Sequence, residues 1–409
     1  MTYVELLQRL VSARRFGMKL GLERMRELLD TLGAPDRKLG TVVHIAGTNG
    51  KGSTVAMVAA LARSAGKRVA TYTSPHLSTL RERITIDGQL VSEDEVVRAA
   101  EEVSAAGGDE LTFFEQVTAI AFVIIAARAV DITVLEVGLG GRLDATNVVA
   151  APIAAVTGVA LDHEAILGTT LDAIAFEKAG IFKRGQRAFI GCAGEPAAVP
   201  LLVQHARAAG VAELSVIDEP ANVTLALPGA HQQQNAALAL ALVEALGLAP
   251  DRSVLATLSH PGRFEIVGDV ILDGAHNPHG ARALAATLQE RGLRPTLVVA
   301  VSADKDVAAI ASALEPQVSA VIATRYQQER ALAPEDLANG FRAAVGQGGA
   351  QAMQIETAPD LATAIARART LGSPILIAGS LFLVGEARTL LLGAPTDPVV
   401  VSDPVSARA

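Results

Sequence analysis

A glycine-rich turn that contains one lysine is the part of the sequence best suited to chemistry. It runs from Gly47 to Ser53 and reads Gly-Thr-Asn-Gly-Lys-Gly-Ser. Glycines let backbone N–H groups approach phosphate oxygens, and Lys51 would reach the β- and γ-phosphates of a nucleotide. The apolar segment 41–46 predicts a buried strand, and residues 53–64 predict a helix whose N-terminus favours negative charge. This order of elements predicts a phosphate-binding site.

The turn departs from the usual phosphate-loop pattern at one position. That pattern places Ser or Thr directly after the lysine, whereas Gly52 stands there in this chain. A glycine turn without function is the alternative interpretation. The flanking strand and helix favour the phosphate site, because a chance match would lack them.

Polar groups at the ends of two further strands are the next candidates. Glu136 lies in the apolar strand predicted at 132–137, where a carboxylate is costly unless it is paired or binds a metal. In nucleotide-hydrolysing proteins an acid on a nearby strand often holds Mg²⁺. An ion pair with Arg142 is the alternative. Thr73 and Ser74 end the strand predicted at 68–73, where open α/β sheets place their ligands; an ordinary loop is the other interpretation.

Composition and charge narrow the class of protein. The chain has 409 residues and a net charge of −8, so neither nucleic acid nor an anionic membrane surface is the expected partner. The single cysteine, Cys192, allows no internal disulfide and agrees with a reducing compartment. The N-terminal segment lacks a signal-peptide core, and the apolar run 117–127 is too short to span a bilayer. We expect a soluble, cytoplasmic protein.

The order of the elements predicts an α/β fold with two domains. Half of the residues are hydrophobic, which suits mainly parallel sheets buried on both faces. Strands and helices alternate until Pro and Gly break the pattern near 259–264. We therefore predict a P-loop ATP-binding domain over residues 1–262 and a smaller, Rossmann-like α/β domain over 263–409. From about Ala394 the chain is rich in Pro, Ser and Asp, and we expect a frayed end.

Seven motifs in a fixed order resemble those of the bacterial folylpolyglutamate synthases, within the Mur ligase superfamily, and the resemblance covers nearly the whole chain. They are GTNGKGS (47–53), TSPHL (73–77), LEVGLGGRLDATN (135–147), LDH (161–163), EKAGIF (177–182), PGRFE (261–265) and DGAHNP (273–278). The unusual Gly52 is normal for this family.

The resemblance implies roles for individual residues. One set would bind ATP: Gly47, Thr48, Asn49, Gly50, Lys51, Gly52, Ser53, Asn235, Arg263 and Asp273. Thr73 and Glu136 would hold one Mg²⁺. His163 would hold a second, with Lys178 carrying a carbamate, since an unmodified lysine is a cation and cannot bind a cation. Lys51, His163 and Lys178 would be the catalytic residues.

The resemblance also implies the substrates. Residues near a pterin-carrying substrate would be Thr112, Phe113, Phe114, Glu115 and Leu143, although the two phenylalanines are equally suited to a core. The reaction would activate a carboxylate with ATP as an acyl phosphate, which the amine of L-glutamate then attacks. Dihydropteroate and reduced folates would be the acceptors, and we expect a monomer.

Four alternatives remain open. The chain would be a folylpolyglutamate synthase without the dihydropteroate activity, or a Mur-type ligase for a cell-wall nucleotide precursor. Only 46 residues precede Gly47, which leaves little room for the extra domain of the latter. A P-loop switch would hydrolyse nucleotide without an amino acid. A non-catalytic nucleotide-binding module would not need Lys51, Glu136, His163 and Lys178 together.

Overall fold

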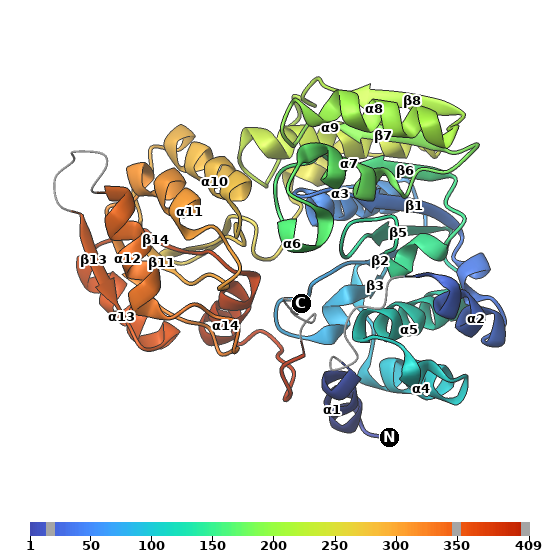
Figure 1. Cartoon of the computed structure of the whole chain (residues 1–409), viewed down its shortest axis with the longest axis horizontal. Helices are drawn as coiled ribbons and strands as arrows, with labels where there is room; N and C mark the ends of the chain where they lie inside the picture. Colours follow the sequence, from blue (N-terminus) through green and yellow to red (C-terminus); the bar gives the residue numbers. More distant parts are fainter. Residues whose placement is uncertain (14–20, 346–352, 402–409) are drawn as a thin grey trace.

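The computed structural model describes residues 1–13, 21–345 and 353–401, which form two α/β domains (Figure 1). In the described residues the first domain has an eight-stranded sheet in the order β4-β3-β2-β5-β1-β6-β7-β8. Only β3 and β4, at one edge, run antiparallel to their neighbours. The strands are β1 (Thr41–Ala46), β2 (Val69–Tyr72), β3 (Ile84–Ile86), β4 (Gln89–Leu90), β5 (Ile132–Glu136), β6 (Ile153–Val156), β7 (Arg187–Gly191) and β8 (Glu213–Ile217).

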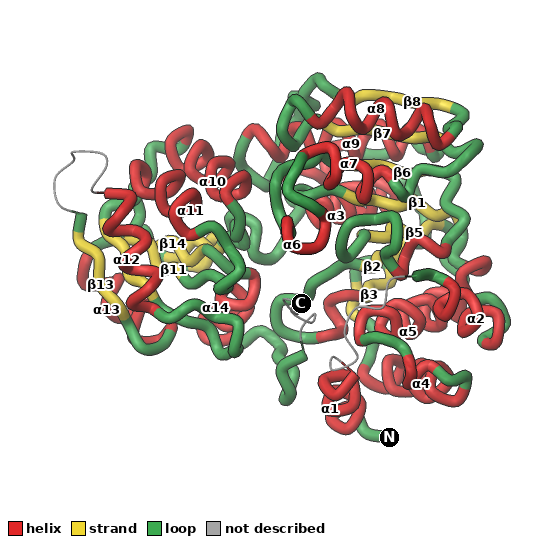
Figure 2. The backbone as a smooth tube through the Cα atoms, in the orientation of Figure 1, coloured by secondary structure: helices red, strands yellow, loops and turns green. Residues whose placement is uncertain are grey.

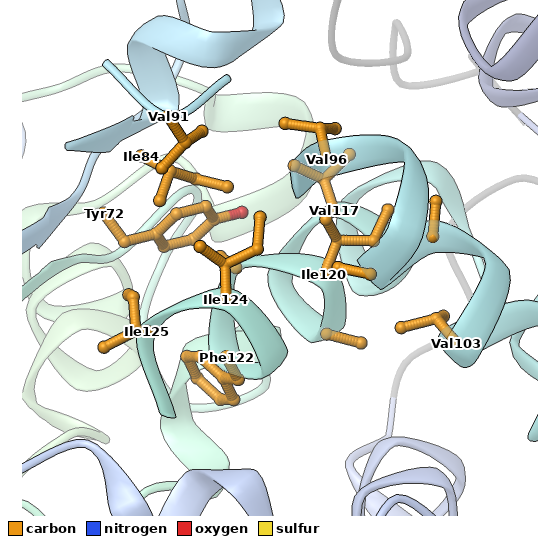
Figure 3. Packing of buried hydrophobic residues seen from close by; sticks show 14 of the residues in the cluster. Tyr72, Ile84, Val91, Val96, Val103, Val117, Ile120, Phe122, Ile124 and Ile125 are labelled. Atoms are coloured by element: carbon orange, nitrogen blue, oxygen red, sulfur yellow. The ribbon is translucent and has the colours of Figure 1, made fainter. Parts of the chain in front are cut away.

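Helices cover both faces of this sheet, as its apolar strands require (Figure 2). Successive residues of β1 face opposite sides: Val43 and Ile45 pack with α3 and α9, whereas Val42 packs on the other face. The tyrosine of β2, Tyr72, is buried beneath α4 and α5 (Figure 3). The helices are α1 (Tyr3–Ala13), α2 (Glu23–Thr31), α3 (Lys51–Ser64), α4 (Glu93–Ala105), α5 (Phe113–Arg128), α6 (Glu164–Leu167), α7 (Leu171–Ala179), α8 (Ala198–Ala209) and α9 (Ala230–Ala245).

The second domain repeats this architecture on a smaller scale. Its described sheet has six strands in the order β13-β12-β11-β14-β10-β9, parallel except for β9. The strands are β9 (Glu265–Val267), β10 (Val270–Leu272), β11 (Thr296–Val299), β12 (Ala320–Ala323), β13 (Gln354–Thr357) and β14 (Ile375–Ala378). The helices are α10 (Pro278–Glu290), α11 (Val307–Leu314), α12 (Pro334–Val345), α13 (Leu361–Leu371) and α14 (Leu381–Leu392). The predicted fold class, two mainly parallel α/β units, is confirmed.

The strands that the sequence did not predict lie at or near sheet edges. Both residues of β4 are exposed, and most residues of β8 and β13 are only partly buried. Such strands lack the apolar run by which buried parallel strands are found. The second sheet begins at β9, close to the predicted boundary at 262/263, which stays a prediction.

The C-terminal strap, residues 394–401, returns from α14 to the first domain. Asp397 accepts hydrogen bonds from Thr79 Oγ1 at 2.7 Å, from the Leu80 N–H at 2.7 Å and from the Tyr3 hydroxyl at 3.1 Å. Val401 is buried in the core of the first domain. The predicted frayed end is therefore wrong for 394–401, because composition cannot reveal partners more than 300 residues away along the chain. Residues 402–409 lie outside the described residues.

We expect Asp397→Ala to lower the free energy of unfolding by about 2 kcal/mol, because three donors lose a charged acceptor. Urea denaturation followed by circular dichroism measures this change. Glu219→Ala removes an exposed carboxylate and is the matched control. A loss for Asp397→Ala no larger than that for the control would show that these three hydrogen bonds add no net stability.

Candidate active site

A cavity of about 430 Å³ lies where the carboxyl ends of the two sheets face each other. From the first domain it is lined by segments that follow β1, β2, β5 and β6, which are adjacent in the sheet. From the second domain it is lined by segments that follow β10, β11 and β14, which are also adjacent. This is the edge at which parallel α/β sheets bind ligands.

The glycine turn folds tightly against its neighbours. A Cβ on Gly47 would overlap Thr157, and a Cβ on Gly50, whose φ is +85°, would overlap Asn235. The Thr157 hydroxyl donates to the Asn49 carbonyl oxygen at 2.6 Å. The turn is thus held by the segment after β6 and by α9, and its predicted residues from Gly47 to Ser53 all line the cavity.

Gly52, the departure from the usual pattern, has a neighbour of its own. A Cβ at this position would lie 3.2 Å from His260 Nε2 and 3.7 Å from Glu136 Oε2. His260 belongs to the linker between the domains. A larger residue at position 52 would therefore press on the linker and on the carboxylate at once.

Two lysines share one carbonyl group of the turn. Lys51 Nζ donates to the carbonyl oxygens of Gly47 at 3.1 Å and Thr48 at 3.3 Å, and Lys178 Nζ donates to that of Gly47 at 3.0 Å. Lys178 is buried. Burial, and then the charge of Lys51, lower the pKa of Lys178 to about 7. Phosphate oxygens would give both ammonium groups better partners than a carbonyl does.

Glu136 is a buried carboxylate at the end of β5. The Ser74 N–H donates to Glu136 Oε2 at 3.3 Å. Burial raises the pKa of Glu136, although Lys51 and other cations oppose the shift. The alternative ion pair with Arg142 is wrong, because Arg142 NH2 pairs with Glu177 Oε1 at 2.8 Å.

The side chains of the cavity suit Mg²⁺ only when the phosphates of a bound nucleotide supply further oxygen donors. The described residues contain no cluster of three or more His, Cys, Asp or Glu that could hold a metal. Mg²⁺ commonly binds to one or two carboxylates and to substrate phosphates, so Glu136 beside the phosphate turn suits it. Ser74 lines the cavity, whereas the Thr73 hydroxyl donates to the Glu82 carbonyl oxygen at 3.4 Å.

His163 has an unusual backbone conformation. Its φ of +53° is left-handed, which is uncommon outside glycine and is frequent at functional sites. It lines the cavity, as Lys178 does. Burial lowers the pKa of His163 to about 4 in spite of the adjacent Asp162, so the imidazole is neutral near pH 7 and has a lone pair free for a metal.

The predicted nucleotide contacts beyond the turn also reach the cavity. Asn235 Nδ2 donates to Gln232 Oε1 at 3.0 Å, while Asn235 Oδ1 is buried without a hydrogen-bond partner in the described part of the chain. Asp273 accepts from the N–H groups of Phe264 and Ala275, both at 2.9 Å. Burial raises the pKa of Asp273, and the nearby Arg263 opposes this shift.

Four of the five predicted pterin-side residues line the cavity, and Phe113 does not. Phe114 and Leu143 line the cavity, and the ring of Phe114 packs so closely on Gly138 that a Cβ there would overlap it. Thr112 and Glu115 line it too, but they cap α5: Glu115 Oε2 accepts from the Thr112 N–H at 2.8 Å. Phe113 is fully buried in the core, with the Arg83 guanidinium 5.4 Å from its ring centre.

Three residues that join the two domains were missed. Asp162, Asn277 and Lys305 meet at the cavity through hydrogen bonds of 2.7 and 2.8 Å. Asp162 and Asn277 stand in two of the quoted motifs, which was a usable signal. Lys305 lies in a loop after β11 with no recognisable pattern.

The two domains and the phosphate turn at their junction define the Mur ligase class. The model of the Mur ligase middle domain matches residues 45–197, and that of the Mur ligase glutamate ligase domain matches residues 262–381. The dihydrofolate synthase/folylpolyglutamate synthase of Mycobacterium tuberculosis is 36% identical, over 90% of this chain and 89% of that protein. The protein of the same name from Bacillus subtilis is 33% identical, over 92% and 96%.

Solved structures agree with this assignment. Folylpolyglutamate synthase of M. tuberculosis complexed with ADP has a TM-score of 0.87 at 33% identity and covers 96% of this chain and 100% of that one. FolC of Escherichia coli in complex with DHPP and ADP has a TM-score of 0.85 at 31% identity and covers 95% and 97%. The chain belongs to the Mur ligase family, among the dihydrofolate and folylpolyglutamate synthases, as its motifs predicted.

Other relatives are longer than this chain. It spans about half the length of two proteins, from Haloferax volcanii and Halobacterium salinarum, that are each 36% identical to it and named probable bifunctional folylpolyglutamate synthase/dihydropteroate synthase. No helix within the described ranges is long and apolar enough to cross a membrane.

The low pKa of Lys178 predicts a pH dependence of stability. In the unfolded chain an ordinary lysine has a pKa of about 10.4, so between about pH 7 and pH 10 the unfolded chain binds one more proton than the native protein. The free energy of unfolding therefore rises with pH in this window. From pH 7 to 9 we expect this residue to contribute a rise of about 2 kcal/mol, which Lys178→Met abolishes.

Urea denaturation in CO₂-free buffers at several pH values measures this effect. Lys67→Met, at an exposed lysine, is the control and should keep the slope of the wild-type protein. Parallel pH profiles for wild type and Lys178→Met would contradict the assignment.

Proposed function

We propose that this chain is an ATP-dependent ligase that adds L-glutamate to dihydropteroate and to reduced folates. One observation carries the proposal: a single cavity is lined by the phosphate turn, the buried carboxylate Glu136 and an apolar wall that includes Phe114 and Leu143. The turn suits ATP, and the wall suits a flat heteroaromatic ring. Relatives with these names, and structures with ADP or with DHPP, support both assignments.

The proposed chemistry begins with a carboxylate, which is a poor electrophile because its charge is delocalised. The acceptor carboxylate attacks the γ-phosphorus of ATP, the bond to the β-phosphate oxygen breaks, and ADP leaves. The amine of glutamate then attacks the acyl carbon and loses a proton as phosphate departs. Lys51 would stabilise charge on the transferred phosphoryl group.

Water must be kept from the acyl phosphate, which it would hydrolyse. The cavity lies between two domains that meet around it, and most of the residues that face it from both sides are buried or half-buried. We propose that ATP binds between the domains predicted at 1–262 and 263–409, with Arg263 reaching across from their junction. Exclusion of water would also strengthen each charge interaction in the site.

Mg²⁺ would offset the negative charge of the phosphates when bound. Glu136 and Ser74 suit one ion, with Ser74 in the role first assigned to its neighbour Thr73, because Ser74 is the residue that lines the cavity. His163 and a carbamylated Lys178 suit a second. The buried amine of Lys178 is a good candidate for carbamylation, because the reaction requires the neutral amine.

A folylpolyglutamate synthase without the dihydropteroate activity is the second candidate. Some relatives are named for one activity alone: the protein of Lacticaseibacillus casei, 31% identical, is named folylpolyglutamate synthase, and that of Schizosaccharomyces pombe, 32% identical, probable dihydrofolate synthetase. The phosphate and metal residues serve both reactions, so the acceptor side decides. A monomeric state and a cytoplasmic location belong to the same proposal.

Purified protein with ATP, Mg²⁺ and labelled glutamate should form product from dihydropteroate and from tetrahydrofolate, each offered alone. Lys51→Ala should lower both rates by about 10²–10³, the usual loss of one charge contact to a reacting group. This variant controls for a contaminating ligase. Product from tetrahydrofolate alone would leave a folylpolyglutamate synthase, and nucleotide hydrolysis that ignores glutamate would overturn the proposal.

We expect ¹³C-labelled bicarbonate to give one carbamate signal in the NMR spectrum when Mg²⁺ and an ATP analogue are present. Lys178→Arg should lose the signal, because a guanidinium does not form a carbamate under these conditions. Lys183→Arg is the matched control at a second lysine whose pKa burial lowers, to about 8. A signal that persists in Lys178→Arg would place the carbamate elsewhere.

A further inference from the structure

A buried ion pair crosses from one domain to the other beside the phosphate turn. Asp162 lies in the first domain after β6, and Lys305 lies in the second domain after β11. Lys305 Nζ is 2.7 Å from Asp162 Oδ1, and each side chain is only 8% exposed. At this burial an ion pair costs desolvation of both charges, so its presence is poorly explained by stability alone.

The same carboxylate has a second partner from the second domain. Asn277 Nδ2 donates to Asp162 Oδ2 at 2.8 Å and to Asn49 Oδ1 at 3.1 Å. Asn277 Oδ1 accepts from the Gly280 N–H at 2.8 Å and so caps α10. One rigid helix end therefore contacts both Asp162 and the phosphate turn.

Asp162 is also tied to its neighbour, His163. The His163 N–H donates to Asp162 Oδ1 at 2.9 Å, the oxygen that also accepts from Lys305. His163 holds its left-handed backbone conformation at this point. The backbone at His163 is thus held by a carboxylate that residues of the second domain also contact.

Among the described basic groups that face Asp162, Lys305 makes the closest contact, at 2.7 Å. His163 Nε2 and His276 Nε2 lie farther from the carboxylate, at 3.9 and 4.0 Å from Asp162 Oδ2. Lys305 also lies 3.7 Å from Asp304, whose side chain is 43% exposed and which is also 3.7 Å from Arg330.

We propose that Asp162 is a positioning residue that makes the catalytic arrangement depend on contact between the domains. Lys305 and Asn277 dock on Asp162, and this docking fixes His163 and Asn49 for phosphoryl transfer. With the domains apart, the carboxylate loses these partners and the site is incomplete. The inference rests on the proposed ligase function.

A double-mutant cycle tests the docking. Asp162→Asn and Lys305→Met should each lower kcat by about 30-fold or more, the usual effect of removing one partner of a buried charge pair, with KM for ATP within about threefold of wild type. The double variant should be no worse than the poorer single variant, because both changes break one contact. Lys305→Arg should recover much of the activity.

The chain offers a matched control for this cycle. Arg282 NH2 and Glu195 Oε1 form another ion pair between the domains, at 2.6 Å, but its side chains are 56% and 37% exposed. Arg282→Met should keep kcat within about twofold, since exposed pairs contribute little. An equal loss in this variant would show that any charge at the domain junction matters, and would overturn the specific role of Asp162.

A second measurement does not depend on the identity of the acceptor. Small-angle scattering with an ATP analogue should show a more compact wild-type protein, whereas Asp162→Asn and Lys305→Met should bind the analogue by calorimetry and remain expanded. Compaction equal to wild type, or additive losses of kcat in the double variant, would overturn the inference. If wild type ligates neither folate acceptor but the scattering result holds, the proposed function fails and the docking stands.

Discussion

The structure depends on the absence of side chains at two positions of one turn. Gly47 and Gly50 leave room only for backbone between Thr157 below and Asn235 beside the turn. The turn therefore lies close against α9 and the segment after β6, at the edge where the neighbouring strands β5, β1 and β6 end, and the phosphate, carboxylate and imidazole positions fall within one cavity. A methyl group at either glycine would overlap one of these side chains. The Rossmann-like second domain completes the cavity with the segments that follow its strands β10, β11 and β14.

Burial gives the charged groups of the cavity their particular properties. Lys178 is driven toward the neutral amine, while Glu136 and Asp273 are driven toward the protonated acid. Asp162 is the exception: burial alone would raise its pKa, but His163 and Lys305 more than offset this effect and lower it. The cavity therefore contains one carboxylate, Asp162, that is ion-paired with Lys305. It also contains two others, Glu136 and Asp273, whose ionised form burial disfavours until a cation binds nearby.

Sequence patterns predict the site residues well where a functional residue also stands out from its neighbours within one strand, turn or helix. The glycine turn lies between a strand and a helix, and Glu136 is a single acid in an apolar strand, so each is visible within a short window. Phe113 and Phe114 show the limit of such reading: adjacent residues of a helix point about 100° apart, and only one of the two faces the cavity. The contacts of Asp162 with Asn277 and Lys305 span 115 and 143 residues, and no local pattern contains them.

The C-terminal strap has a consequence for the freedom of the two domains. The chain passes from the first domain to the second through the linker near His260, and it comes back through the strap, at a separate place (Figure 1). A body attached at one point can turn about any axis, whereas a body attached at two points turns only about the line through them. The second domain is thus connected to the first at two separate places, which restricts its motion relative to the first domain more than the linker alone would.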